Sequence, residues 1–230
     1  MKINGMTRAA MALQYWERKQ EVVANNLANV DTTGFRAERV FARLLEGEIT
    51  VADVATDLRN GTFKQTGNPL DFALAGDGFF VVQTPEGERI TRAGSFRLDE
   101  GGRLVDQNGN PVLGEQGEIV VPPGTVTVDG TGLLRVDDKE IGRFRIETIP
   151  PGSQLEHAGA SLFVPPDGMA ALPEADRTVR QGYLEDSNVS SIGSMVDMIS
   201  IQRAYSAVQK TVVTLDGIRE TISTQLGRPV

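Results

Sequence analysis

The 230-residue sequence contains no cysteine and a single histidine, His157. The lack of cysteine excludes disulfide bonds, a thiol nucleophile and a cysteine-ligated metal site. A lone histidine has no evident partner for a zinc site or a catalytic triad, and we expect His157 to be a loop residue. Basic residues are also scarce, with 23 Lys and Arg against 31 Asp and Glu and a net charge of -8, and an acidic surface repels nucleic-acid phosphates. We therefore expect no metal, no cofactor and no nucleic-acid partner.

Two further signals are missing. No apolar run approaches the roughly 20 residues that a membrane-spanning helix needs, which argues against membrane insertion. The first residues, Met1–Gly5, show no apolar core followed by a small-residue cleavage site, so we expect no cleavable signal peptide.

Proline is absent between Ser187 and Leu226, where apolar residues repeat in a heptad pattern. The residues that carry the repeat are Met198, Ile201, Tyr205, Val208, Val212, Leu215, Ile222 and Leu226. Spacings of 3 and 4 predict a long helix that buries a narrow stripe against another helix. Ser190 or Ser191 could cap its start. A stripe of this length needs a partner of similar length, and the other end of the chain offers one.

The amino-terminal segment from Ile3 to about Val30 predicts that partner helix. Its apolar residues at helical spacing are Ile3, Met6, Ala10 and Leu13, and then Ala24, Leu27 and Val30. Three asparagines, Asn25, Asn26 and Asn29, are poor helix formers near its end. Gly34 could close the helix in the left-handed conformation. The stripe fits a core-facing helix and an intermolecular seam equally well.

The middle of the chain has a different character, because 17 of the 25 glycines and 9 of the 11 prolines lie between Asp71 and Leu184. Short apolar or alternating runs predict strands there, at residues 79–82, 103–105, 118–121, 125–128 and 144–149. Asn108-Gly109 and Asp129-Gly130 are typical hairpin turns. We therefore predict a mixed α and β fold in which paired terminal helices flank an inserted all-β domain of short antiparallel strands.

Four motifs resemble those of bacterial flagellar rod and hook proteins, and they occur in that family's order. They are residues 24–36 (ANNLANVDTTGFR), 76–82 (GDGFFVV), 91–105 (TRAGSF and then GRLV) and 182–205 (GYLEDSNV, MVDMI and then QRAY). Together they span nearly the whole chain. Within the family, the short segment Phe41–Gly61 and the run from Pro111 to Pro122 resemble the proximal rod protein, whereas the intact residues 202–205 resemble distal rod or hook proteins as much.

The resemblance implies a coiled coil of the two terminal helices that lines a hollow axial tube, with the β domain outside. The sequence pattern itself divides the chain into 1–35 (amino-terminal helix), 36–70 (a connector, partly helical around Val40–Leu45 and loop-like around Gly61–Pro69), 71–184 (β domain) and 185–230 (carboxy-terminal helix). The implied partners are copies of itself, other rod proteins and the flagellar export apparatus. The implied location is the rod that crosses the periplasm. The expected assembly interface comprises Ile3, Met6, Leu13, Asn25, Asn26, Leu27, Asn29, Gly34, Phe35, Met195, Met198, Ile201, Tyr205, Val208, Val212, Leu215 and Ile222.

Two other classes of protein fit parts of the sequence. An enzyme acting on peptidoglycan could use the acidic pairs Asp99-Glu100 or Asp137-Asp138 as acid and base, but both pairs lie in turn-like sequence and fit solvated loop charge better. Gly76-Asp77-Gly78 fits a turn before a buried strand better than a phosphate loop. An adhesin with helical arms is the second alternative, and the asparagine-rich residues 25–29 argue against it.

Overall fold

A computed structural model describes residues 5–45, 48–159 and 161–226, with side chains described except at 42–52 and 222–226. The chain divides into two compact units. The helical unit contains α1 (Gly5–Ala28), β1 (Glu38–Leu45), β2 (Glu48–Thr56) and α2 (Ser191–Leu226). The β unit contains Asn29–Ala37 and Thr56–Val189. None of the described helices combines the length and the apolar character that crossing a membrane requires.

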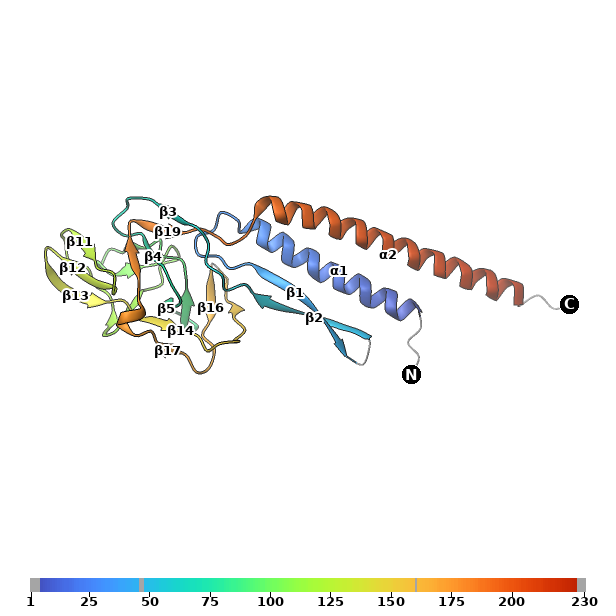
Figure 1. Ribbon diagram of the computed structural model, residues 1–230, viewed down its shortest axis with the longest axis horizontal. Coiled ribbons are helices and arrows are strands. Elements are labelled where there is room, and N and C mark those ends of the chain that lie inside the picture. Colours follow the sequence, from blue (N-terminus) through green and yellow to red (C-terminus); the bar gives the residue numbers. More distant parts are fainter. Residues whose placement is uncertain (1–4, 46–47, 160, 227–230) are drawn as a thin grey trace. The chain divides into compact units, whose positions relative to one another are not determined.

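In the helical unit, α1 and α2 pack against each other and run antiparallel (Figure 1). This confirms the predicted pairing of the two terminal helices. Ser190 caps α2 as predicted, because its Oγ accepts a hydrogen bond from the backbone N–H of Gly193 at 3.2 Å. Neither helix contains a proline. The predicted fold class, paired terminal helices around an inserted domain of short antiparallel strands, is confirmed.

The prediction of a helix around Val40–Leu45 is wrong, because these residues belong to β1, which pairs with β2. β1 also contacts α1. The Asn26 side chain fixes the start of the strand: its Oδ1 accepts from the Glu38 N–H at 2.9 Å and its Nδ2 donates to the Glu38 carbonyl at 2.8 Å. Arg and Leu favour helix only weakly, and pairing with a neighbouring strand overrides such a preference.

The β unit is built from short strands with antiparallel pairing. Its elements are β3 (Phe63–Gln65), β4 (Phe72–Leu74), β5 (Phe79–Thr84), β6 (Gly87–Thr91), β7 (Arg97–Leu98), β8 (Leu104–Val105), β9 (Leu113–Gly114), β10 (Gly117–Glu118), β11 (Val126–Val128), β12 (Leu133–Val136), β13 (Lys139–Arg143), β14 (Ile146–Thr148), β15 (Glu156–His157), β16 (Leu162–Val164), β17 (Ala170–Ala171), the 3-10 helix η1 (Glu174–Asp176), β18 (Val179–Gln181) and β19 (Tyr183–Glu185). Within the described residues, the largest sheet has the order β15-β16-β6-β5-β14-β17.

Four of the five runs predicted as strands contain one, although β8 at 104–105 has only two residues. The prediction at 118–121 is wrong, because β10 ends at Glu118 and Val120 forms only an isolated bridge with Arg103. Asp129 begins the predicted turn between β11 and β12, where its Oδ1 accepts from the Thr131 N–H and hydroxyl and from the Leu133 N–H. The segment at Gly61–Pro69, expected to be a loop, contains β3, which pairs with β19. Residues near both ends of the β unit therefore share one ladder.

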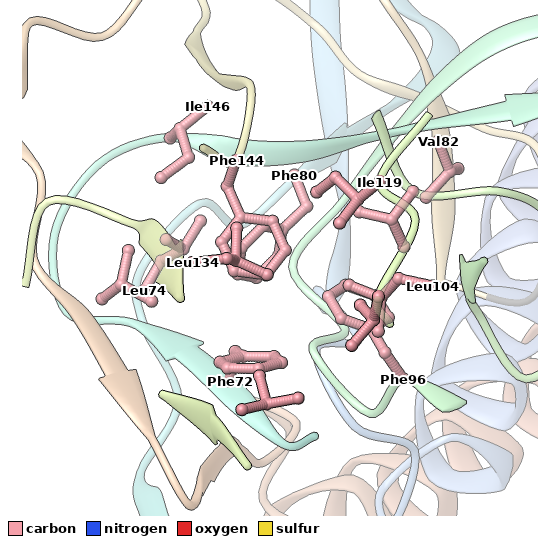
Figure 2. Packing of buried hydrophobic residues seen from close by; sticks show 14 of the residues in the cluster. Phe72, Leu74, Phe80, Val82, Phe96, Leu104, Ile119, Leu134, Phe144 and Ile146 are labelled. Atoms are coloured by element: carbon pink, nitrogen blue, oxygen red, sulfur yellow. The ribbon is translucent and has the colours of Figure 1, made fainter. Parts of the chain in front are cut away.

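Phenylalanine rings fill the centre of the β unit (Figure 2). Phe144 is completely buried, and its ring centroid lies 5.1 Å from that of Phe72 and 5.2 Å from that of Phe80, both in edge-on contact. Phe96 completes the group, 5.3 Å from Phe80. Edge-on aromatic pairs add about 0.5–1.5 kcal/mol beyond the area that they bury. The β unit thus has a hydrophobic core made entirely from its own strands and loops.

Candidate assembly surface and junction

One face of α2 is the predicted heptad stripe. Ile201 is 1% exposed and is the most buried residue of the described helix. The other described members of the stripe are half-buried: Met198, Tyr205, Val208, Val212 and Leu215. The side chain of Ile222 lies outside the described part of the chain. Since α2 packs on α1, this stripe is the surface that pairs the two helices.

The matching face of α1 differs at two positions from the predicted stripe. Met6, Leu13 and Leu27 are half-buried as expected, but Ala10 and Ala24 are exposed, and the residues before them, Ala9 and Val23, are buried instead. The residues buried along α1 are Ala9, Val22, Val23 and Asn26. Because polar residues interrupt the apolar pattern in the middle of α1, the sequence alone did not show which residues form this buried face. Ile3 lies outside the described residues.

A second face of α2 carries apolar side chains that this chain leaves uncovered. Ile192, Met195, Val196 and Ile199 are 75%, 54%, 57% and 52% exposed. We call these four residues the apolar patch of α2. At about 100° per residue, the patch centres roughly 150° around the helix from the stripe that pairs with α1. Four exposed apolar side chains at helical spacing mark a surface suited to contact with another protein.

The asparagine and glycine motif after α1 has roles inside the chain. Asn25 is exposed, and Asn29 is half-buried, with its Oδ1 accepting from the Thr32 hydroxyl at 3.2 Å. Gly34 adopts the predicted left-handed conformation (φ +67°). It does not cap α1, which ends six residues earlier, and a Cβ there would overlap the backbone nitrogen of Ala93. Phe35 is buried. A role between subunits for these residues stays a prediction.

Three segments of the β unit meet at what we call the junction: residues 34–37, 57–63 and 183–188. Backbone hydrogen bonds join them, from Gly34 N–H to the Glu185 carbonyl at 2.8 Å and from Asp186 N–H to the Thr62 carbonyl at 2.9 Å. Asn188 adds three more, since its Oδ1 accepts from Ala37 N–H and its Nδ2 donates to the carbonyls of Asp57 and Arg59. The segment that follows α1 is therefore held beside the segment that precedes α2.

Glu185 lies at the centre of the junction and is completely buried with two arginines. Its Oε1 is 2.7 Å from Nη1 of Arg36, and its Oε2 accepts from Nε of Arg92 at 2.9 Å. Asn60 connects the two guanidinium groups, with its Oδ1 3.0 Å from Nη2 of each. Burial lowers the pKa of Arg92, and the Glu185 carboxylate opposes that shift. Buried charges need such pairing, because an isolated one costs several kcal/mol.

One residue of each acidic pair considered for catalysis has a structural role in a turn: Asp99 in the first pair and Asp137, whose Oδ1 accepts from the Thr125 N–H, in the second. Asp99 Oδ1 accepts from the N–H groups of Gly101 and Arg103, and these bonds, together with the Arg103 side chain, lower the pKa of Asp99. Asp137 lies at positive φ, between β12 and β13. His157 was expected in a loop but belongs to β15, where its ring packs 4.5 Å from Phe163 and 5.5 Å from Phe35.

Three family models match successive parts of the chain. "Flagella basal body rod protein" matches residues 6–36, "Flagellar hook protein FlgE/F/G D1 domain" matches residues 73–136, and "Flagellar basal body rod FlgEFG protein C-terminal" matches residues 180–226. The chain is also 34% identical over 227 residues to the flagellar basal-body rod protein FlgF of Caulobacter vibrioides, covering 92% of this chain and 93% of that one. The chain belongs to the flagellar rod protein family.

Other members of the family match over similar lengths. FlgF of Escherichia coli is 34% identical over 223 residues, covering 86% of this chain and 88% of its own. FlgG of Agrobacterium fabrum is 30% identical over 258 residues, covering 95% and 97%. The predicted resemblance to flagellar rod proteins is thus confirmed.

The rod-protein motifs contain the three buried charged residues that meet at the junction, Arg36, Arg92 and Glu185, and sequence reasoning singled out none of them. Gly34 and Arg36 end the amino-terminal motif, Arg92 lies in the central one, and Glu185 and Asn188 lie in the carboxy-terminal one. The only sign of the junction in the sequence was that three of the motifs each contain one of these charged residues. Its meaning depends on the fold, because the three positions meet only when strands far apart in the sequence are paired.

Proposed function

We propose that this chain is a structural subunit of the flagellar basal-body rod that assembles through its terminal helices with copies of itself and with other rod proteins. The observation that carries the proposal is the apolar patch of α2, which is exposed on a helix whose opposite face is already occupied by α1. Burying an apolar side chain of this size stabilises a contact by about 1.5–3 kcal/mol. Burial of four such side chains would stabilise the contact between a rod subunit and its neighbour.

A proximal position in the rod is the better-supported one. The FlgF relatives are 31–35% identical to this chain, and the FlgG relatives are 30–31% identical. The FlgG of Agrobacterium fabrum nevertheless matches over nearly the whole chain, which keeps a distal rod position as the second candidate.

The patch suggests how assembly proceeds. If the patch binds a different surface of the next copy, two copies do not form a closed dimer, because each still has one free binding surface. Such head-to-tail contacts build helical arrays. In this arrangement the paired helices form the wall of the axial structure. We further propose that the chain reaches the rod through the flagellar export apparatus and lies in the part of the rod that crosses the periplasm.

The proposal is tested with Ile199→Asp in cells that lack the wild-type gene. A carboxylate in a surface that must become dry on assembly costs several kcal/mol unless it finds a partner. We expect the purified variant to melt at the wild-type temperature, because Ile199 is half exposed, and we expect the cells to lack filaments and not to swim.

Gln209→Glu is the matched control, because it also adds one negative charge to an exposed position of α2. Cells with this variant should swim like the wild type. Electron microscopy of concentrated wild-type protein should show tubes or rings that Ile199→Asp does not form. Normal swimming by Ile199→Asp would exclude the apolar patch as an assembly surface.

A further inference from the structure

The two arginines of the junction differ in how completely they are bonded. Arg92 uses all of its donors: Nε to Glu185, Nη1 to the carbonyls of Gly76 and Gly78, and Nη2 to Asn60 and to the Leu74 carbonyl. Its carbonyl partners lie in and between β4 and β5. Arg92 therefore belongs to the strands of the β unit whether or not the segment after α1 is in place.

Arg36 is buried to the same degree but is held by far fewer contacts. It donates one hydrogen bond, from Nη2 to Asn60, and places Nη1 beside the Glu185 carboxylate. Among the residues that the structure describes, its Nε has no hydrogen-bond partner. The attachment of Arg36 thus depends mainly on the charge of Glu185.

Glu185 is the residue on which all three segments converge. Its carboxylate pairs with Arg36 and Arg92 and accepts from the Gly61 N–H at 2.9 Å, and its carbonyl accepts from the Gly34 N–H. If the carboxylate loses its charge, two buried guanidinium groups lose the one carboxylate that is ion-paired with both. If Arg36 loses its charge, Arg92 and Glu185 still form a complete pair.

We propose that Glu185 is a positioning residue that holds both connecting segments, residues 34–37 and residues 183–188. Arg36 holds only the first of these segments, so that residues 34–37 can detach while residues 183–188 stay in place. Loss of Arg36 loosens only residues 34–37, whereas loss of the Glu185 charge loosens both segments and leaves the phenylalanine core intact. The inference rests on the proposed function in one respect, because these segments matter for carrying the helices that assemble.

Amide hydrogen exchange on the full chain tests the hierarchy, because it reports local opening residue by residue. Gly34 and Ala37 report on the first segment, and Asp186, bonded to the Thr62 carbonyl, reports on the second. Leu104 and Val112, bonded inside the core, are the internal reference. In Arg36→Met, Gly34 and Ala37 should exchange at least about tenfold faster, with Asp186 and the core amides unchanged.

Glu185→Gln, which keeps the shape of the side chain, should speed exchange at Gly34, Ala37 and Asp186 together and leave the core amides unchanged. Arg36→Lys keeps the charge and should restore most of the protection that Arg36→Met loses. Arg135→Met is the matched control, since it removes an arginine from an exposed ion pair with Glu140, and it should change none of the reporter amides.

Three results would overturn the inference: faster exchange at Asp186 in Arg36→Met, core amides that accelerate as much as Gly34 in Glu185→Gln, or a Glu185→Gln chain that does not fold. Exchange is measured on the free chain, so its outcome is independent of assembly. A failed exchange prediction overturns this inference alone, and normal swimming by Ile199→Asp overturns the proposed function alone.

Discussion

Ile201→Asp should separate α1 from α2 and abolish rod assembly. The Ile201 side chain is 1% exposed on the stripe that packs against α1, so a carboxylate there is buried without a partner and costs at least about 3 kcal/mol. Helices of 24 and 36 residues take most of their stability from packing of this kind. Circular dichroism at 222 nm should show a clear loss of helix, and cells with the variant should not swim.

The β unit should not respond to Ile201→Asp, because its core contains no residue of the helices. Its melting transition should stay at the wild-type temperature. Gln202→Glu is the control, with a new charge on the next residue, which is exposed; its helix content and motility should match the wild type. Wild-type helicity in Ile201→Asp would mean that the stripe is not what pairs the two helices.

Phe144→Ala should lower the free energy of unfolding of the β unit by about 3–5 kcal/mol, the usual cost of removing a large buried aromatic side chain. Phe144 is completely buried and contacts the rings of Phe72 and Phe80, so neighbouring rings cannot collapse into the cavity without breaking their own contacts. Urea unfolding followed by the loss of β-sheet signal measures the change.

Phe144→Leu is the companion variant, since it keeps an apolar side chain in the same place and should cost clearly less than the alanine variant. Both variants should retain the α1–α2 helix signal at low urea. If Phe144→Ala costs under about 1 kcal/mol, the ring cluster is not the stabilising centre of the β unit.

The arrangement of helices and strands along the chain could be predicted because the sequence patterns that mark them are long. A heptad stripe sustained from Met198 to Leu215 allows one interpretation, and the glycine- and proline-rich middle allows only short strands. Periodicity failed where the signal was short. Residues 40–45 have a composition compatible with a helix, and only β2 and the Asn26 side chain, both contributed from elsewhere in the chain, make them a strand.

Candidate interface residues were predicted well where they belong to a long periodic stripe and poorly where they do not. Met195 was expected at an interface and is exposed, and Ile201 was expected on a seam and is buried. Gly34 and Phe35 were expected at an interface as well, yet the β unit itself uses them. Neither the Arg36–Glu185 pair nor the Asn188 bridge has a local pattern, because each joins residues about 150 positions apart.

The hydrogen bond between Gly34 and Glu185 has an evolutionary consequence. Two residues so far apart in sequence touch each other, so the β unit between them has its entry and exit side by side, and only the β1–β2 hairpin of the intervening chain belongs to the helical unit. Such an insertion can lengthen, shorten or be exchanged without moving the points at which it is attached. A lineage of rod proteins could therefore diversify its β unit freely while the two flanking helices stay under a single, unchanged constraint.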